Sequence, residues 1–293
     1  MANHQKAVLY QSDLFLLERW EEDSPLSMEA QREQIFSEFL QLGVRGREPY
    51  RIQKRNAGSY VNDLPAHSQE LLQRVRQPNI GRDIVNDQLI LWLRTYYADD
   101  SEPAWDTIYE EEMTRFLEED MICNDESLYN FGPNWERIFL LKPEILETGQ
   151  SLAKYEEVTQ LALSEAAQFE ADAHSSAEDS RDPADDLELD SQISFDYHQK
   201  KSLNRIHIVD ATTLASDGPD AGKVLIVFFD EFGQTVRYAR EEADEAVENT
   251  ALTNAHLDDH ACWANAKIGE LYQRGHPLGP PYSGNAGGRF VRH

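Results

Sequence analysis

The sequence is poor in cysteine. Its 293 residues include two cysteines, Cys123 and Cys262, and neither lies near a second cysteine at a metal-binding spacing. This excludes a disulfide framework and a zinc site built on cysteine pairs. Two cysteines allow one disulfide at most, and we expect both thiols to be reduced.

The sequence also lacks long apolar runs. The longest, VLIVFF at residues 224–229, is far shorter than the ~20 residues that span a bilayer. The opening residues, MANHQKAVLYQSD, lack the apolar stretch of a secretory signal. We therefore expect no membrane span and a cytoplasmic location.

The sequence also contains few basic residues relative to acidic ones. Asp and Glu number 54 against 27 Lys and Arg, for a formal net charge of -27, and almost the whole excess follows Asp99. Such a field repels nucleic-acid phosphates and anionic lipids. We therefore expect neither as a partner, whereas a basic protein partner fits. The Arg- and Tyr-containing stretch at 43–58 is interpreted as a loop lying on the protein's own acidic surface rather than a nucleic-acid site.

Known catalytic signatures are missing as well. The sequence contains no Gly-rich phosphate loop, no G-x-S-x-G elbow, no H-E-x-x-H and no C-x-x-C. No cofactor is predicted, the catalytic residues are unknown, and whether the protein is an enzyme stays open.

What is present is organised around residues 203–230, where two apolar runs each end at an aspartate. Their composition predicts buried strands at 205–209 and 223–229, with a hairpin turn at 230–233 leading into a strand at 234–238. Further strands are predicted at 88–96, as a central strand, and at 137–141. Residues 8–17 fit a strand or the edge of a packed segment.

Helical periodicity and capping residues predict helices elsewhere. The first is predicted from Ser27 to just before Gly43, and the second over 66–77. A third begins at Asp100 or Ser101, a fourth covers 151–171, and a fifth extends from about 254 towards 272. The pattern predicts an α/β (or α+β) fold with a single mixed sheet of about five strands and flanking helices, plus a mostly helical N-terminal extension.

Composition suggests three regions. Residues 1–85 form the extension, residues 86–272 the α/β domain, and residues 273–293 a flexible Gly/Pro-rich tail. Within the domain, the acidic stretch at about 172–192 holds too little apolar material to form a core and is predicted to be disordered.

Four segments occur in the order LRTYYADDSEPAW, IVDATTL, VLIVFF and TVRYAREEADEAVENTALTNAHLDD. Together they resemble the signature segments of a largely bacterial domain family of unknown function, over residues 88–263 with the acidic stretch as an insertion. The resemblance implies one α/β domain and implies no activity. The matching positions are Arg94, Thr95, Asp99, Asp100, Trp105, Asp210, Thr212, Thr213, Leu214, Arg237, Glu248, Asn249, Leu252 and Asn254.

Polar residues at the strand ends form the candidate site. Open α/β sheets place ligands at the carboxyl ends of strands, where Asp210 and Asp230 stand. The alternative is turn chemistry, in which each aspartate accepts backbone hydrogen bonds from residues that follow. Arg94 is expected to pair with Asp210, or with Asp99. The candidate cleft comprises Arg94, Asp210, Thr212, Asp230, Arg237, Asn249 and Asn254.

Two further constellations have ordinary explanations. His256 and His260 lie one helical turn apart, a spacing that can hold a metal, but no glutamate lies between them. Exposed helix histidines are favoured, so no metal is predicted. Asp99 and Asp100 could act as acid and base or bind magnesium, but capping of a helix N-terminus explains them more simply.

These observations support two alternative hypotheses for the function. The leading interpretation is an interaction or accessory protein whose anionic surface meets a basic partner. The alternative is an enzyme or small-ligand-binding domain with a polar site near Arg94, Asp210 and Asp230. A concave pocket where these side chains converge would favour the alternative, and a broad surface without convergence would favour the interaction protein. The oligomeric state and the role of residues 1–85 stay open.

Overall fold

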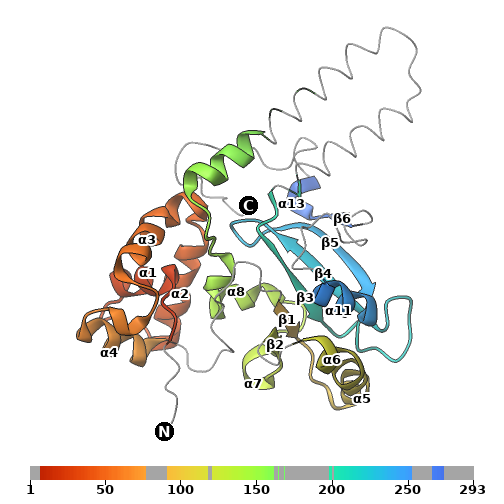
Figure 1. Ribbon diagram of the computed structural model, residues 1–293. Helices are drawn as coiled ribbons and strands as arrows, with labels where there is room; N and C mark the ends of the chain where they lie inside the picture. The colour runs from red at the N-terminus through yellow and green to blue at the C-terminus, as the bar shows by residue number, and fades with distance from the viewer. Residues whose placement is uncertain are drawn as a thin grey trace.

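The computed structural model describes residues 7–76, 91–117, 121–161, 164, 168, 198–199, 201–252 and 266–273 (Figure 1). The acidic stretch, Asn254, both candidate metal histidines, Cys262 and the segment after Gln273 lie outside these residues. Among the described helices, none is long and apolar enough to cross a bilayer.

A single mixed sheet of six strands, in the order β2-β1-β3-β4-β5-β6, forms the centre of the molecule. The first three in that order run parallel, and the pairs from β3 onward are antiparallel. This confirms the predicted fold class. The bounds are β1 Leu91–Arg94, β2 Ile122–Cys123, β3 Asn204–Val209, β4 Lys223–Phe229, β5 Thr235–Glu242 and β6 Lys267–Ile268.

Helices pack on both faces of the sheet, which explains why its inner strands are apolar on both sides. One face packs against a helical segment after β1 and against α11, around Trp92, Ile226 and Phe228. The other packs against short helices around Leu93, Ile208 and Phe229. The first group is η2 Asp99–Ser101, α5 Glu102–Asp106, the π-helical η3 Thr107–Met113, α6 Thr114–Phe116 and α11 Ala243–Leu252; the second is α7 Glu126–Tyr129, η5 Trp135–Arg137, α8 Ile138–Leu141 and η6 Pro143–Leu146.

The helix expected after Asp99 is confirmed, but it begins without a side-chain capping hydrogen bond. Asp99 and Asp100 lie in its first turn, where a carboxylate meets the positive end of the helix dipole. The predicted capping hydrogen bond is therefore wrong. The position of Asp99 and Asp100 agrees with the predicted interaction with the helix dipole.

Three segments differ from the prediction, the first because a short apolar pattern does not separate helix from strand. Residues 137–141, predicted as a strand, form the end of η5 and α8, which bury Ile138 and Phe139. The predicted basic loop is α3 Gly43–Ala57, since Val44, Arg47 and Tyr50 recur at helical spacing and are buried. Of residues 8–17, predicted as a strand or the edge of a packed segment, most lie in α1 Gln11–Arg19, which is helical and buries Leu14 and Phe15.

The C-terminal part of the described chain also differs. Residues 241–248, for which the sequence pattern gave no helix or strand, form the end of β5 and most of α11. Most of the helix predicted from about 254 towards 272 lies outside the described residues, and its last part is β6 followed by α13 Glu270–Gln273. Two-residue strands such as β2 and β6 are too short to show a periodicity, so the sequence could not reveal them.

The N-terminal region is mostly helical, as predicted. It contains α1, α2 Met28–Leu40, α3, η1 Val61–Asp63 and α4 Ala66–Val75, with residues 152–161 helical further on. Ser27 caps α2 by accepting from the Ala30 amide at 3.2 Å. Phe15, Phe39 and Tyr50 pack ring to ring in its core. Figure 1 shows α8 between these helices and the sheet.

One buried arginine joins the helical region to the sheet. Arg47, 2% exposed, donates to the carbonyls of Phe39 (3.2 Å), Leu40 (3.1 Å), Leu146 (2.7 Å) and Glu231 (2.9 Å). These belong to α2, η6 and the β4–β5 turn. Burial lowers the pKa of Arg47 to about 10, with nearby carboxylates opposing the shift. The guanidinium thus ties three elements together through neutral acceptors.

Arg47→Ala should destabilise the protein by about 3 kcal/mol or more, because four buried carbonyls lose their donor. Arg45→Ala is the control: this arginine lies two residues away in α3, is exposed and pairs with Glu156. The control should change stability by less than about 0.5 kcal/mol. Urea unfolding of both variants measures the difference, and equal effects would contradict this role for Arg47.

A cluster of buried carboxylates lies where α1 meets η6. Asp13 accepts from the Tyr10 amide at 2.9 Å and lies 3.3 Å from Arg76 Nε. Burial raises the pKa of Asp13 to about 6 although Arg76 opposes the shift. Burial likewise raises the pKa of Glu147, which accepts from the Ser12 amide at 2.8 Å. The fold therefore favours protonated carboxyls here.

This cluster predicts a pH dependence. The stabilisation from a protonated Asp13 is present below pH 4 and is lost as the pH rises through about 6. Relative to wild type, Asp13→Asn should thus gain about 2 kcal/mol between pH 4 and pH 7. Asp63→Asn is the control, since Asp63 caps Tyr60 in the same way at an exposed position. Denaturant titrations at several pH values would contradict the prediction if the difference stayed constant.

Candidate interaction groove

The predicted cleft residues do not converge. Asp210 follows β3 and Asp230 follows β4, and these strands are antiparallel, with Asn204 opposite Phe229. The two aspartates therefore lie at opposite ends of these neighbouring strands. The rule that places ligands at the carboxyl ends of strands applies to parallel strands, and the sequence does not give the strand directions.

Each aspartate performs turn chemistry. Asp210 Oδ1 accepts from the amides of Thr212 (3.1 Å) and Thr213 (2.9 Å), and its Oδ2 accepts from Arg240 Nη2 at 2.6 Å. Thr212 itself is exposed. The interpretation of Asp210 as a turn residue is confirmed, with an arginine partner that the sequence did not indicate.

Asp230 is more deeply buried. Its Oδ1 accepts from the amides of Phe232 and Gln234, both at 2.9 Å, and its Oδ2 accepts from the Tyr272 hydroxyl at 2.8 Å. Burial raises the pKa of Asp230, while these hydrogen bonds oppose the shift. Asp230 shapes the β4–β5 turn and anchors α13 to it.

The expected Arg94–Asp210 pair is wrong. Arg94 is 2% exposed and forms an ion pair with Glu102, and its Nε donates to the Tyr96 carbonyl at 2.9 Å. Its guanidinium lies over the rings of Tyr97 (4.4 Å) and Trp105 (4.8 Å). The need for a carboxylate was predicted correctly. The partner comes from the helix that follows β1, eight residues away, rather than from the neighbouring strand.

The remaining described candidates, Arg237 and Asn249, face a different part of the protein. Arg237 Nε donates to His198 Nδ1 at 3.1 Å, and burial beside Arg237 lowers the pKa of His198 to about 3. Asn249 Nδ2 donates to Glu241 Oε1 at 3.0 Å. Among the described residues no group of three or more His, Cys, Asp or Glu side chains could hold a metal ion.

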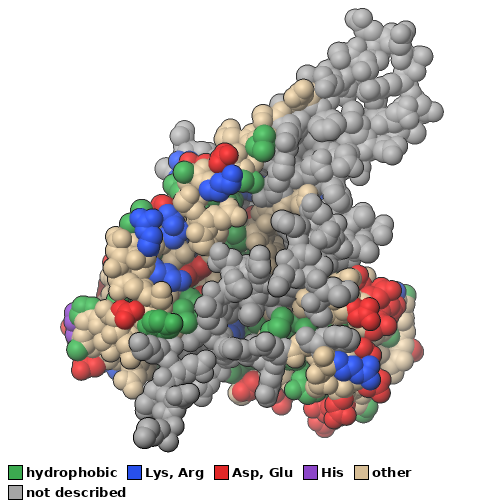
Figure 2. Space-filling model, viewed as in Figure 1, with side chains coloured by type: hydrophobic (Ala, Val, Ile, Leu, Met, Phe, Trp, Pro, Cys, Tyr) green, Lys and Arg blue, Asp and Glu red, His purple; other side chains and the backbone are tan. Residues whose placement is uncertain are grey.

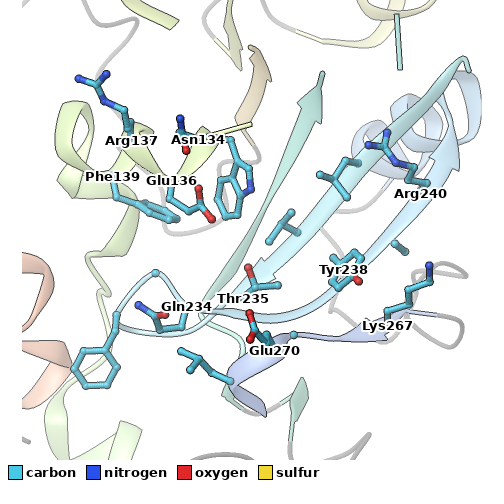
Figure 3. A pocket seen from close by; sticks show the side chains of 18 of the residues that line it. Asn134, Glu136, Arg137, Phe139, Gln234, Thr235, Tyr238, Arg240, Lys267 and Glu270 are labelled. Atoms are coloured by element: carbon cyan, nitrogen blue, oxygen red, sulfur yellow. The ribbon is translucent and has the colours of Figure 1, made fainter. Parts of the chain in front are cut away.

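A large open groove lies on the face of β4 and β5 opposite Arg237 (Figure 3). Its volume is about 1780 Å³. The floor is made by cross-strand neighbours of β4 and β5, namely Lys223 with Glu242, Leu225 with Arg240, and Val227 with Tyr238. Lys267 of β6, opposite Tyr238, extends it.

Among the described residues, the helices on this face lie over β1, β3 and the inner part of β4 and leave the outer part of β4 and β5 to the groove. The core cluster under α7, α8 and η6 covers β1, β3 and the inner part of β4, including Val227 and Phe229. Leu225 and Tyr238 are only partly buried at the margin of this cluster. Trp135 and Phe139 of η5 and α8 form one wall, and Glu270 with Leu271 of α13 form part of the rim.

Most cations of the groove already have partners. Arg240 pairs with Asp210, Lys223 lies 3.7 Å from Glu242, and Arg137 lies 3.4 Å from Glu33. The exposed carboxylates of Glu136 and Glu245 have no ion pair among the described residues. The groove therefore presents a floor in which Leu225, Val227 and Tyr238 lie among charged side chains, and a rim that carries the carboxylates of Glu136 and Glu245.

Sequence reasoning did not find this groove. The signal available was in residues 235–242, TVRYAREE, where a strand carries polar residues on both faces and therefore cannot be fully covered.

Comparisons with known proteins add nothing to this geometry: no protein-family model matches the chain, and neither does any curated protein or solved structure. The resemblance over residues 88–263 stays a hypothesis.

The contacts of Asp210 predict which residues are energetically coupled. Asp210→Ala and Arg240→Ala should couple by about 0.5–1 kcal/mol in a double-mutant cycle, because each removes the other's partner. Arg94→Ala with Asp210→Ala should couple by less than about 0.5 kcal/mol, since the two side chains share no partner. Chemical denaturation gives both cycles, and strong coupling of Arg94 to Asp210 would refute the described contacts.

Proposed function

We propose that the protein is an interaction protein whose groove holds a segment of a basic partner polypeptide. The observation that carries the proposal is the groove on β4 and β5, where the described helices leave Leu225 and Tyr238 partly exposed and where Glu136 and Glu245 stand on the rim. The proposal keeps the cytoplasmic location expected from the sequence.

The size of the groove supports a polypeptide rather than a metabolite. Small-molecule sites usually occupy about 300–1,000 Å³ and bring a few polar groups to one point. This groove is larger, at about 1780 Å³, and its polar groups are spread along an open surface. The absence of convergence among Arg94, Asp210 and Asp230 likewise gives the enzyme alternative no support from these residues.

The surface charge supports a cationic partner. Figure 2 shows Asp and Glu side chains gathered over α11 and the α5–α6 segment, while Lys and Arg gather over α3. Exposed acids of α11 include Asp244, Glu245 and Glu248, and Glu245 also lines the groove. The acidic surface is thus continuous with the rim, and it would raise the encounter rate of a basic segment.

A defined probe tests the proposal. A fluorescent 12-residue peptide of alternating arginine and phenylalanine should bind the full chain, and binding should weaken steeply between 50 and 500 mM salt. Glu136→Lys/Glu245→Lys should weaken it by about tenfold or more, because two rim charges of the groove are reversed. Fluorescence anisotropy measures both effects.

The control is Glu110→Lys/Glu111→Lys, which makes the same charge change at exposed positions of η3, outside the groove. This variant should keep the affinity within about threefold, since only the general field changes. Equal losses in both variants would show that the peptide responds to net charge, and the proposal would then fail.

A further inference from the structure

The described chain ends on the rim of the groove. After β6, Gly269 donates to the Val236 carbonyl at 2.9 Å, and Tyr272 binds Asp230, so α13 is held against β5. Glu270 and Leu271 of α13 line the groove, and Figure 3 shows Glu270 near Thr235. The residues that follow Gln273 therefore start next to the groove.

Those residues carry charge opposite to that of Glu136 and Glu245 on the groove's rim. The segment 274–293, RGHPLGPPYSGNAGGRFVRH, contains Arg274, Arg289 and Arg292 and no Asp or Glu. Phe290 stands between two of the arginines, as an apolar group among cations. In a chain with a net charge of -27, this is a cationic segment beside an acidic rim.

We propose that residues 274–293 occupy the groove of their own chain and compete with the basic partner, an inference that rests on the proposed function. Arginine side chains of the segment meet the carboxylates of Glu136 and Glu245, and Phe290 packs on the floor near Leu225 and Tyr238.

Length and linkage favour the chain's own segment as occupant. Twenty residues can span at most ~70 Å when extended, so the segment can reach along the groove from Gln273. Tethering by a short flexible linker gives an effective concentration on the order of 1 mM. If the segment binds the groove with an intrinsic Kd of about 0.1 mM, this effective concentration weakens the apparent affinity of any separate partner about tenfold.

Competition is tested with full chains throughout. A labelled peptide of residues 274–293 is titrated into wild type and into Arg274→Glu/Arg289→Glu/Arg292→Glu. The triple variant should bind the peptide about tenfold more tightly, because its own segment no longer occupies the groove. The charge-matched control is Arg19→Glu/Arg45→Glu/Arg55→Glu, at exposed positions of α1 and α3, which should bind like wild type.

The outcomes separate this inference from the proposed function. If the arginine–phenylalanine peptide binds wild type and the tail variant equally well, the inference is wrong while the groove keeps its function. If neither peptide binds either form, both fail.

Photo-cross-linking locates the segment directly. A benzoylphenylalanine at position 290 of the full chain should cross-link to groove residues of the same molecule, as mass spectrometry would show. Cross-links to α1–α4, or between two copies of the chain, would overturn the inference, the second by assigning the segment to a neighbour's groove.

Discussion

The burial of the Arg47 guanidinium is the interaction on which the arrangement of the two halves depends. Its carbonyl acceptors come from α2, η6 and the β4–β5 turn, so these elements can move apart only if a desolvated cation loses its partners. Close packing at the same place reinforces the constraint. A Cβ at Gly43, whose φ is +60°, would lie 2.8 Å from the Phe232 ring, and one at Gly233, with φ +74°, would lie 2.9 Å from Phe139. Only residues without side chains let α3, the turn and α8 approach this closely.

The groove lies beside the same turn. The β4–β5 turn is held against α3 and α8, and on the same face the helices after β2 lie over β1, β3 and the inner side of β4. On the same face, the floor formed by Leu225, Tyr238 and Arg240 is left partly exposed. The other face of these strands is packed against α11 and buries Val224 and Ile226. One face of these strands is therefore part of the core, and the other is partly exposed in the groove.

Much of the fold could be predicted from sequence, since β3 and β4 are long apolar runs and α2 carries a capping serine before a helical pattern. What could not be predicted depends on tertiary contacts. Residues 137–141 are apolar in either conformation, and α3 is helical although its buried face contains the charged Arg47. The candidate site failed for a similar reason. Strand direction decides whether Asp210 and Asp230 meet, and it is set by pairing between distant segments rather than by local pattern. The need of Arg94 for a carboxylate could be predicted, but the sequence favoured Asp210 or Asp99 and did not single out Glu102.

The distribution of buried charge makes the surface more acidic than the composition alone indicates. Among the described residues, the buried cations are Arg32, Arg47, Arg94, Lys142, Lys201, Arg205 and Arg237, whereas the buried acids are Asp13, Asp230, Glu231 and Glu241. A chain already short of basic residues thus places several of them inside, as donors to carbonyls and as partners of buried acids. Fewer cations remain at the surface to neutralise its carboxylates, and those in the groove are mostly paired. An approaching polypeptide therefore meets negative charge that the protein's described cations leave unbalanced, and a basic segment is the ligand that gains most from it.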